Sequence, residues 1–530
     1  MRILIAFVIA ASGIAHTAHA QKDAALRSFN NENFRTAANQ FKQVVAQEPS
    51  AENFFYLGTA LARVGNYDSA RVAYDLGIKA DPKYGRNYAG MARTFLSQNN
   101  ATKAQEYFGM AKSTVNANKD VGYYMWLADA YTNNANANPQ EAINQLNRAK
   151  EINYKDAGIY MHLGDAFYKM QKGGDAVSNY ETALQYNPNL ALAHTRIGDV
   201  WTDARRFPEA LAAYEKALAI NAEFAPALKG LSELYYRTGQ HDKAKPLWER
   251  YMKVGEMTDD VRYRDIYLSF LTKDYAGTQR AANALLQTDT SKLVMYRLLA
   301  YSDYETGNYE RGMQTLNNFL RRQDSTKLIA SDFEYLAKFY QKTGNDSLAL
   351  LQFERAVALD TTRKELYGDI AQSYYAKREY RKAAQFYEKK VRTATKPSVE
   401  DYYRLGLSYY QDTAYAKADS AFMKVTELSS TWPVGHLWRG YANLGLDNPD
   451  KPTGLAIPHF EKTIETGQAD TVKYKKELIR ANEFIGNFHV LYERYDEAMT
   501  YYNRVLALDP DYAAVRESVR SIQEFKKKSK

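Results

Sequence analysis

Apolar residues recur along the chain in a pattern with a period of 34 residues. The segments that begin at Tyr56, His162, Tyr335 and Arg404 show it most clearly. In each, a large apolar residue precedes Gly or Ala, and an aromatic or apolar residue follows three positions later. Beyond a turn come an Ala, an aromatic residue and a small or aliphatic residue, at intervals of four and three. Because side chains at i, i+3 and i+4 share one helix face, each period predicts two short helices packed antiparallel.

The template also specifies the residues at the helix contacts and at the turn. Small residues are expected where the two backbones approach, as with Gly58 and Ala70 or with Gly164 and Ala176. A proline such as Pro82 stops the second helix. Glycine supplies the positive φ after the first helix. The turn glycines expected on this basis are Gly65, Gly239, Gly307 and Gly344.

These residues resemble the tetratricopeptide repeat family, and the resemblance implies an all-α fold, an α-solenoid of helix–turn–helix repeats. Continuing the register gives about fourteen units over nearly all of the chain. The expected units are 18–50, 51–84, 85–120, 121–156, 157–190, 191–224, 225–258, 259–292, 293–326, 330–363, 364–397, 399–432, 433–470 and 471–510. The resemblance also implies that the first helix of each pair lines a concave groove and that the second lies on the convex side.

Three departures from the template set the expected domain boundaries. The 259–292 unit has Thr278 in place of the small alanine, which makes it a divergent repeat and a candidate hinge. The insertion "LDNPDKPTG" predicts a projecting loop, and a charged helix after the last unit predicts a polar cap. The expected domains are a signal peptide over 1–20, an N-terminal solenoid over 21–258, the divergent repeat over 259–292, a C-terminal solenoid over 293–510, and a capping helix with a basic tail over 511–530.

The start of the chain predicts export. Arg2 precedes an apolar run over 3–11, and Ala18 and Ala20 form a small-residue pattern typical of signal-peptide cleavage after Ala20. The run is too short to span a bilayer. The chain has no cysteine, which excludes disulfides, thiolate–zinc sites and a lipid-modified N-terminal cysteine. We therefore expect a soluble exported protein, in the periplasm or alternatively associated with the outer membrane or secreted.

Charge and motifs argue against nucleic-acid binding and catalysis. The net charge is +8, from 70 basic and 62 acidic residues that are interspersed, and the run over 526–528 is the single basic cluster. The histidines are scattered over different repeats, and no phosphate-binding glycine loop or nucleophile elbow occurs. Gly173 and Gly174 fall at the turn position of their repeat and are interpreted as a helix end. We expect no catalytic residue, cofactor or metal site, no nucleic-acid partner and no transmembrane segment.

Most of the 44 tyrosines occupy repeat positions that the template assigns to the core. A further set follows the core position of the first helix and is rotated about 100° toward the groove. Its members are Tyr168, Tyr236, Tyr304, Tyr375 and Tyr410, and Tyr403 lies on the same face as Tyr410. Such rings suit an extended peptide, because each offers contact area and a hydroxyl at low entropic cost. They are candidate partner-binding residues, with packing between repeats as the open alternative.

Several triplets combine Asp, Ser or Thr, and a small or aliphatic residue. They resemble the O-glycosylation sequon of exported Bacteroidota proteins. The candidate acceptors are Ser69, Ser325, Ser347, Thr361, Thr413, Ser420 and Thr471. The alternative is that Asp, Ser and Thr favour turns and helix starts without being modified.

These observations favour a non-catalytic periplasmic scaffold or adaptor that binds a protein, or an extended segment of one, within a cell-envelope assembly or secretion complex. The carboxylate clamp known in part of the family is absent, since Phe55, Thr59, Met161 and Asp165 occupy the equivalent places. One alternative is a carbohydrate- or peptidoglycan-associated protein that stacks sugars on the groove tyrosines. Another is an adaptor or regulator in envelope signalling.

Overall fold

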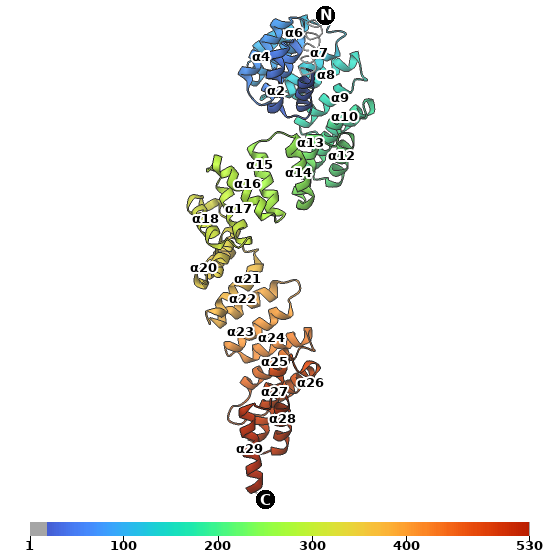
Figure 1. Cartoon of the computed structure of the whole chain (residues 1–530). Coiled ribbons are helices and arrows are strands. Elements are labelled where there is room, and N and C mark those ends of the chain that lie inside the picture. Colours follow the sequence, from blue (N-terminus) through green and yellow to red (C-terminus); the bar gives the residue numbers. More distant parts are fainter. Residues whose placement is uncertain (1–18, 529–530) are drawn as a thin grey trace, which may run out of the picture. The chain divides into compact units, whose positions relative to one another are not determined.

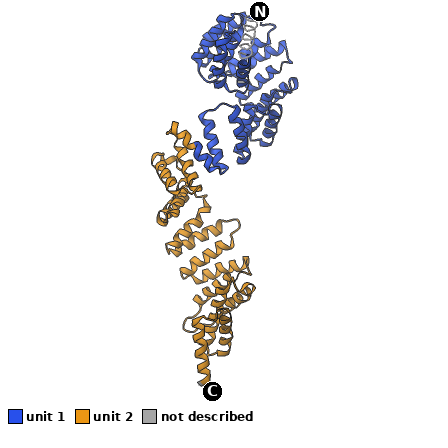
Figure 2. Cartoon of the chain, in the orientation of Figure 1, with its two compact units in different colours: residues 1–281 blue, residues 282–530 orange. Residues whose placement is uncertain are grey.

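The computed structural model describes residues 19–528, and every regular element in this part of the chain is helical (Figure 1). The predicted all-α solenoid is therefore confirmed. The expected signal peptide falls mostly on residues 1–18, which lie outside the described residues. Two compact units divide the chain, residues 1–281 and residues 282–530 (Figure 2).

The helices of unit 1 form pairs that match the predicted repeats. The pairs are residues 19–30 with α2 (Phe34–Gln47), α3 (Ala51–Arg63) with α4 (Tyr67–Ala80), α5 (Gly85–Ser97) with α6 (Ala101–Ser113), α7 (Val121–Thr132) with α8 (Pro139–Ile152), α9 (Ala157–Lys169) with α10 (Gly173–Tyr186), α11 (Ala191–Asp203) with α12 (Phe207–Ile220), and α13 (Ala225–Arg237) with α14 (His241–Val254). Next come α15 (Asp259–Leu271) and α16 (Tyr275–Thr288). The unit boundary falls within α16, inside the 259–292 repeat, whose role as a hinge stays a prediction.

Unit 2 continues the same alternation. Its pairs are α17 (Leu293–Glu305) with α18 (Tyr309–Arg322), α19 (Ala330–Lys342) with α20 (Asp346–Leu359), α21 (Tyr367–Ala376) with α22 (Tyr380–Thr393), α23 (Val399–Gln411) with α24 (Tyr415–Leu428), α25 (Pro433–Leu446) with α26 (Ile457–Gly467), and α27 (Lys475–Leu491) with α28 (Tyr495–Leu508). The predicted capping helix is α29 (Ala513–Lys528). Three 3-10 turns, η1 (Ser325–Lys327), η2 (Lys364–Leu366) and η3 (Gln468–Asp470), lie in the connections.

The glycine of the first helix makes room for an aromatic ring of the second helix. A Cβ atom on Gly58 would lie 2.5 Å from Cε1 of Tyr74, and one on Gly406 would lie 2.6 Å from Cε1 of Phe422. Both rings are fully buried. The sequence pattern located these glycines correctly, but the contact that requires them is with a ring rather than with the partner helix backbone.

The turns follow the predicted geometry with one correction. Gly65, with φ of 80°, and the other predicted turn glycines adopt the left-handed conformation. In other repeats a residue with a side chain takes that place, and Gln171 has φ of 60°. Gly173 and Gly174, expected at this turn, instead begin α10. The turn is two residues earlier than the glycine pair suggested, because the repeat register rather than glycine content fixes its position.

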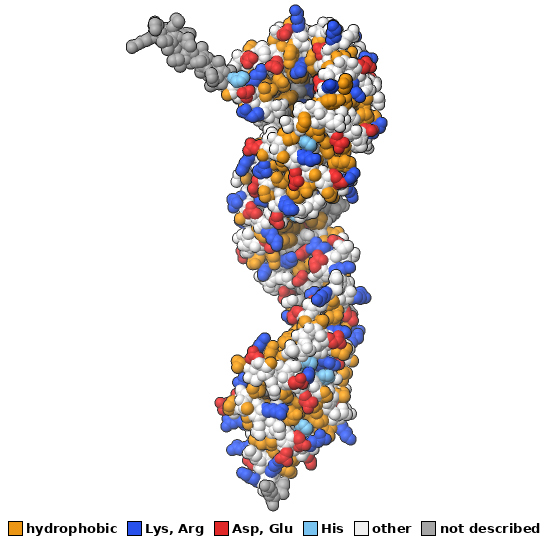
Figure 3. Space-filling view, turned by 90° about the vertical axis from the view of Figure 1, so that its right-hand side faces the viewer, with side chains coloured by type: hydrophobic (Ala, Val, Ile, Leu, Met, Phe, Trp, Pro, Cys, Tyr) orange, Lys and Arg blue, Asp and Glu red, His pale blue; other side chains and the backbone are white. Residues whose placement is uncertain are grey.

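The insertion in the 433–470 repeat forms a loop, as predicted. One carboxylate organises it, since Asp447 accepts hydrogen bonds from the backbone amides of Thr453, Gly454 and Leu455. Burial alone would raise the pKa of Asp447, but these hydrogen bonds hold it well below its usual range. Elsewhere on the surface that Figure 3 shows, Lys and Arg are interspersed with Asp and Glu, as the sequence indicated.

Candidate functional site

The first helices of unit 1 form its inner layer and line two pockets. Successive first helices contact one another directly, as α3 contacts α5, α5 contacts α7, and α7 contacts α9. We call the first cavity the aromatic pocket; it has a volume of about 330 Å³, and Phe55, Arg63, Arg86, Arg93, Trp126 and Asp129 are among its lining residues. We call the second the ion-pair pocket; its volume is also about 330 Å³, and its lining includes Glu32, Tyr168, Arg196, Asp199, Tyr214 and Arg237.

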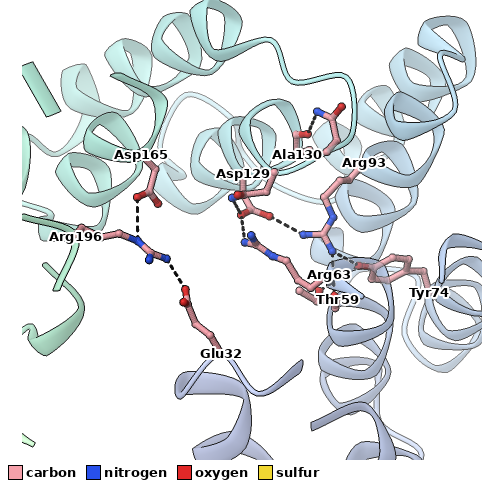
Figure 4. Close-up of polar contacts among 11 residues, drawn as sticks. Glu32, Thr59, Arg63, Tyr74, Arg93, Asp129, Ala130, Asp165 and Arg196 are labelled. Atoms are coloured by element: carbon pink, nitrogen blue, oxygen red, sulfur yellow. Dashed lines mark hydrogen bonds and ion pairs between the residues drawn. The ribbon is translucent and has the colours of Figure 1, made fainter. Parts of the chain in front are cut away.

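Two arginines from different repeats converge on Asp129 in the aromatic pocket (Figure 4). Nη2 of Arg63 lies 3.0 Å from Oδ1 of Asp129, and Nη1 of Arg93 lies 3.1 Å from Oδ2. Arg93 is only 2% exposed and also donates to the hydroxyl of Tyr74 at 3.0 Å. Burial would raise the pKa of Asp129, but the guanidinium charges of Arg63 and Arg93 lower it to about 2. The carboxylate is therefore ionised at neutral pH and links three repeats.

Arg86 supplies a further cation to the aromatic pocket. Its guanidinium carbon lies 5.7 Å from the ring centre of Phe55 and 5.6 Å from that of Trp126, within the range of cation–π attraction. The pocket thus has three arginines and one aspartate among its lining residues. Its charge and its rings suit an anionic segment that carries apolar groups.

Arg196 is the centre of the ion-pair pocket. Its guanidinium nitrogens pair with Glu32 at 2.5 Å, with Asp199 at 3.4 Å and with Asp165 at 3.7 Å, and Figure 4 shows it between Glu32 and Asp165. The carboxylate of Asp199 also accepts a hydrogen bond of 2.8 Å from the buried Tyr214. Burial raises the pKa of Asp199 although Arg196 opposes the shift. Burial alone would lower the pKa of Arg196, but the three carboxylates raise it above its usual range, so the guanidinium stays charged.

The first repeat contacts the end of the seventh, which closes the inner surface of unit 1. The side-chain amide of Asn33 donates to the carbonyl of Val254, and Nε of Arg35 lies 3.0 Å from Oε1 of Glu256. Together with the pair between Glu32 and Arg196, these contacts hold residues 32–35 against helices that follow far later in the chain.

The six candidate tyrosines are all half-buried and are distributed over the two units. Tyr168 lines the ion-pair pocket and donates a hydrogen bond of 2.5 Å to Asp203 on α11. The ring of Tyr236 stacks under the guanidinium of Arg264, whose carbon lies 4.0 Å from the ring centre. In unit 1 these tyrosines therefore contact a charged residue of the next repeat.

In unit 2 each candidate tyrosine packs against another aromatic ring. Ring centres are 5.5 Å apart for Tyr304 and Tyr309, and 5.2 Å apart for Tyr375 and Tyr380. Further contacts include Tyr403 with Trp432 at 5.3 Å, Tyr410 with Tyr415 at 5.5 Å, and Tyr410 with Trp438 at 5.2 Å. The pair of Tyr304 and Tyr309 is tilted, and the other pairs are edge-to-face. The partner-binding role of the six tyrosines stays a prediction.

The charged residues of the two pockets were not singled out from the sequence, although a signal for them exists. It is the residue that directly follows the small residue of the first helix. In the six repeats over 51–258 this position holds Thr59, Arg93, Asp129, Asp165, Asp199 and Glu233, so that all but the first are charged. The first repeat of unit 1 has Leu26 there, and the divergent repeat has Tyr267. In unit 2 the equivalent residues are Tyr301, Lys338, Gln372, Leu407, Tyr441 and Asn487. A charged inner layer is thus a property of the repeats over 85–258.

All seven candidate glycosylation residues are exposed. Six lie at helix starts or in turns, and Ser420 lies within α24. In the described part of the chain, no group of three or more His, Asp or Glu side chains is arranged to hold a metal ion. Across residues 19–528, none of the helices combines the length and the apolar character needed to cross a membrane.

Comparison with known protein families finds one recurring match. Models described as tetratricopeptide repeat match residues 22–84 and 161–227, residues 202–255, and residues 479–512. The search among curated proteins found no match.

Solved structures of repeat proteins also match. The C-terminal part of a TPR repeat-containing protein from Cytophaga hutchinsonii is 35% identical, and the match covers 48% of this chain and 98% of that one with a TM-score of 0.41. A tetratricopeptide repeat protein from Parabacteroides merdae is 15% identical over 55% of this chain and 98% of that one, with a TM-score of 0.28. A thermophilic TPR protein of Thermus thermophilus is 22% identical over 34% of this chain and 98% of that one, with a TM-score of 0.27.

Proposed function

Because the chain belongs to the tetratricopeptide repeat family, we propose that it is a non-catalytic scaffold that binds a segment of a partner protein on the inner surface of unit 1. We further propose that it is exported and works in a cell-envelope assembly or secretion complex. Repeats of this family imply protein–protein interaction, and the stacked helices offer a continuous surface for it.

The observation that carries the proposal is the composition of the aromatic pocket. Three arginines on α3 and α5, opposed by the single carboxylate of Asp129, lie beside the rings of Phe55 and Trp126. A guanidinium held against aromatic rings presents its donors in a fixed plane, which suits carboxylate groups of a peptide. We expect the bound segment to carry acidic and apolar side chains.

The binding proposal can be tested by photo-crosslinking in the native host. A benzoylphenylalanine in place of His162, which lines the aromatic pocket, should form adducts with the bound partner. Adding Arg86→Glu should abolish these adducts, because it reverses the charge beside Phe55 and Trp126. The control is Arg381→Glu, an exposed position on α22. Adducts that persist with Arg86→Glu, or adducts lost with both variants, would exclude the aromatic pocket as the binding site.

Export is supported by the apolar run over 3–11 and by the small residues before Gln21. Cell fractionation, with N-terminal sequencing of the mature protein, tests it, and we expect the sequence to begin at Gln21. The intact mass of the same material tests the glycosylation triplets, whose acceptor residues are all exposed. An unmodified mass would remove that proposal, and a cytoplasmic full-length chain would remove the export proposal.

The carbohydrate alternative has less support from the contacts of the tyrosines. Tyr375 and Tyr410 already stack edge-to-face on neighbouring rings, and Tyr168 is engaged with Asp203. Co-sedimentation with purified sacculi separates the two functions, because a protein-binding scaffold has no reason to pellet with isolated peptidoglycan.

A further inference from the structure

A second candidate binding surface lies in unit 2, between the second helices α18 and α20. This surface is a groove of about 860 Å³, which we call the α18–α20 groove. Its floor is α19, and residues from α18 and α20 form its walls. Ser325 and Leu328, from the connection that contains η1, lie at the end where α19 begins. None of these residues takes part in the function proposed for unit 1.

The floor of the groove is apolar, and each wall contributes a leucine. Phe333, Leu336 and Tyr340 on α19 have the i, i+3, i+7 spacing that places side chains on one helix face. Leu320 contributes from α18, and Leu359 contributes from α20 with 52% of its surface exposed. α19 has 13 residues and is therefore about 20 Å long. The lining residues of α19 run from Phe333 to Tyr340, about 10 Å along the helix axis, so the groove floor matches about two turns of a bound helix.

The rim of the groove is basic. Arg321 on α18 and Arg355 on α20 line it from opposite walls, and no Asp or Glu is among its lining residues. Within residues 19–528, Arg355 donates to Gln352 at 3.4 Å and lies 5.7 Å from the ring centre of Phe333, and neither arginine forms an ion pair.

Carboxylates near the rim are already engaged with other partners. Glu354 accepts a hydrogen bond of 2.5 Å from Tyr374, and Glu334 pairs with Lys338 at 2.6 Å and with Arg363. The two rim arginines therefore remain available for a negatively charged ligand.

We propose that the α18–α20 groove binds an amphipathic helix of a partner protein. The helix presents an apolar stripe to Leu320, Phe333 and Leu359. Acidic residues on both edges of the stripe meet Arg321 and Arg355 on the two walls. Apolar burial supplies the affinity, and the charges select the partner and its position along the groove.

Two synthetic peptides test the proposal on the full mature chain. Both are fluorescein-labelled helices with the same leucine stripe, flanked by glutamates in one and by lysines in the other. Fluorescence anisotropy should show binding of the glutamate peptide and at least about tenfold weaker binding of the lysine peptide. Combining Arg321→Glu with Arg355→Glu should reverse this preference. Leu359→Asp should weaken binding of the glutamate peptide. It should not prevent folding, because the leucine side chain is half exposed.

Controls separate this surface from the proposed site in unit 1. Arg381→Glu on α22 and Arg86→Glu in the aromatic pocket should both leave binding of the glutamate peptide unchanged. If charge reversal at the rim lowers the melting temperature, the neutral double variant Arg321→Gln with Arg355→Gln is used instead. It should weaken binding of the glutamate peptide. Equal binding of the two peptides, no binding of either, or insensitivity to the rim variants would overturn the proposal. A dimer that becomes monomeric with Leu359→Asp in sedimentation velocity would also overturn it, because a second copy would then occupy the groove.

Discussion

The ring of Tyr180 lies so close to Gly164 that a Cβ atom on the glycine would come within 2.3 Å of Cε1 of the tyrosine. The tyrosine is fully buried, so its ring cannot move away from a Cβ atom added at Gly164. Gly164→Ala should therefore lower the free energy of unfolding by about 3 kcal/mol, an overpacking effect measurable by urea denaturation. Gly174→Ala is the matched control, because nothing lies within 4 Å of its Cβ position, and it should be neutral or slightly stabilising. Similar losses in both variants would contradict the packing argument.

Asp129 gives unit 1 a pH-dependent contribution to its stability. Its pKa of about 2 in the folded protein lies below the unfolded value of 3.8, so the ionised carboxylate stabilises the fold above about pH 4. This contribution is lost as the pH falls from about 4 to 2. Asp129→Asn should cost about 2 kcal/mol at neutral pH, and the difference from the wild type should shrink in acid. Urea unfolding at several pH values, followed by the fluorescence of the neighbouring Trp126, measures both.

The control for this linkage is Asp199→Asn. Burial raises the pKa of Asp199, so folding opposes ionisation of this carboxylate instead of favouring it, and the amide should cost less than at Asp129. An equal loss in the two variants, or a loss at Asp129 that does not change with pH, would show that ion pairing with Arg63 and Arg93 is not the cause.

Arg196 neutralises three carboxylates, which come from the turn before α2, from α9 and from α11. Arg196→Ala would leave Glu32, Asp165 and Asp199 facing one another and should destabilise unit 1 by about 3 kcal/mol. Hydrogen exchange should accelerate in residues 31–35, which this arginine helps to hold. Arg35→Ala removes one ion pair of a side chain that is 68% exposed, and its effect should stay below about 1 kcal/mol. Unchanged exchange in Arg196→Ala would show that the contacts of Asn33 and Arg35 suffice to hold this segment.

The candidate tyrosines can be tested for binding separately from packing. Combining Tyr375→Ala with Tyr410→Ala should weaken partner capture and leave thermal unfolding nearly unchanged if the rings serve a partner. Of the two, Tyr410 should contribute more to stability, by about 1 kcal/mol, because its ring contacts Trp438 of the next repeat. Melting curves of the two single variants, beside capture assays, measure the difference. A large loss of melting temperature with intact capture would assign the rings to the core.

The architecture could be predicted because it is encoded locally. A repeat such as 51–84 contains the glycine, alanine and aromatic residue that set its own register, and α3 and α4 lie within its bounds. The turns followed from the same register, even where Gln171 replaces glycine. Packing within one repeat depends on residues within about thirty positions of one another, which a single sequence reveals.

The pockets could not be predicted in the same way, because they depend on how far each repeat rotates relative to the last. Arg93 and Asp129 are 36 residues apart, and Arg196 and Glu32 are 164 apart. Nothing in either repeat alone indicates that these side chains meet. The run of charged residues after the small residue of the first helix, over the repeats 85–258, would have indicated a charged inner layer, but not which residues pair.

The contact between Asn33 and Val254 spans 221 residues, whereas the helix pairs that pack most closely come from the same repeat or from adjacent repeats. A stack of repeats can begin folding anywhere and grow outward, since each unit needs only the next one. This contact forms only when the repeats between its two ends are in place, and the entropy of closing so long a loop must first be offset by those repeats. The first repeat should therefore dock last, which makes the N-terminal unit an all-or-none assembly within a fold that otherwise grows one step at a time.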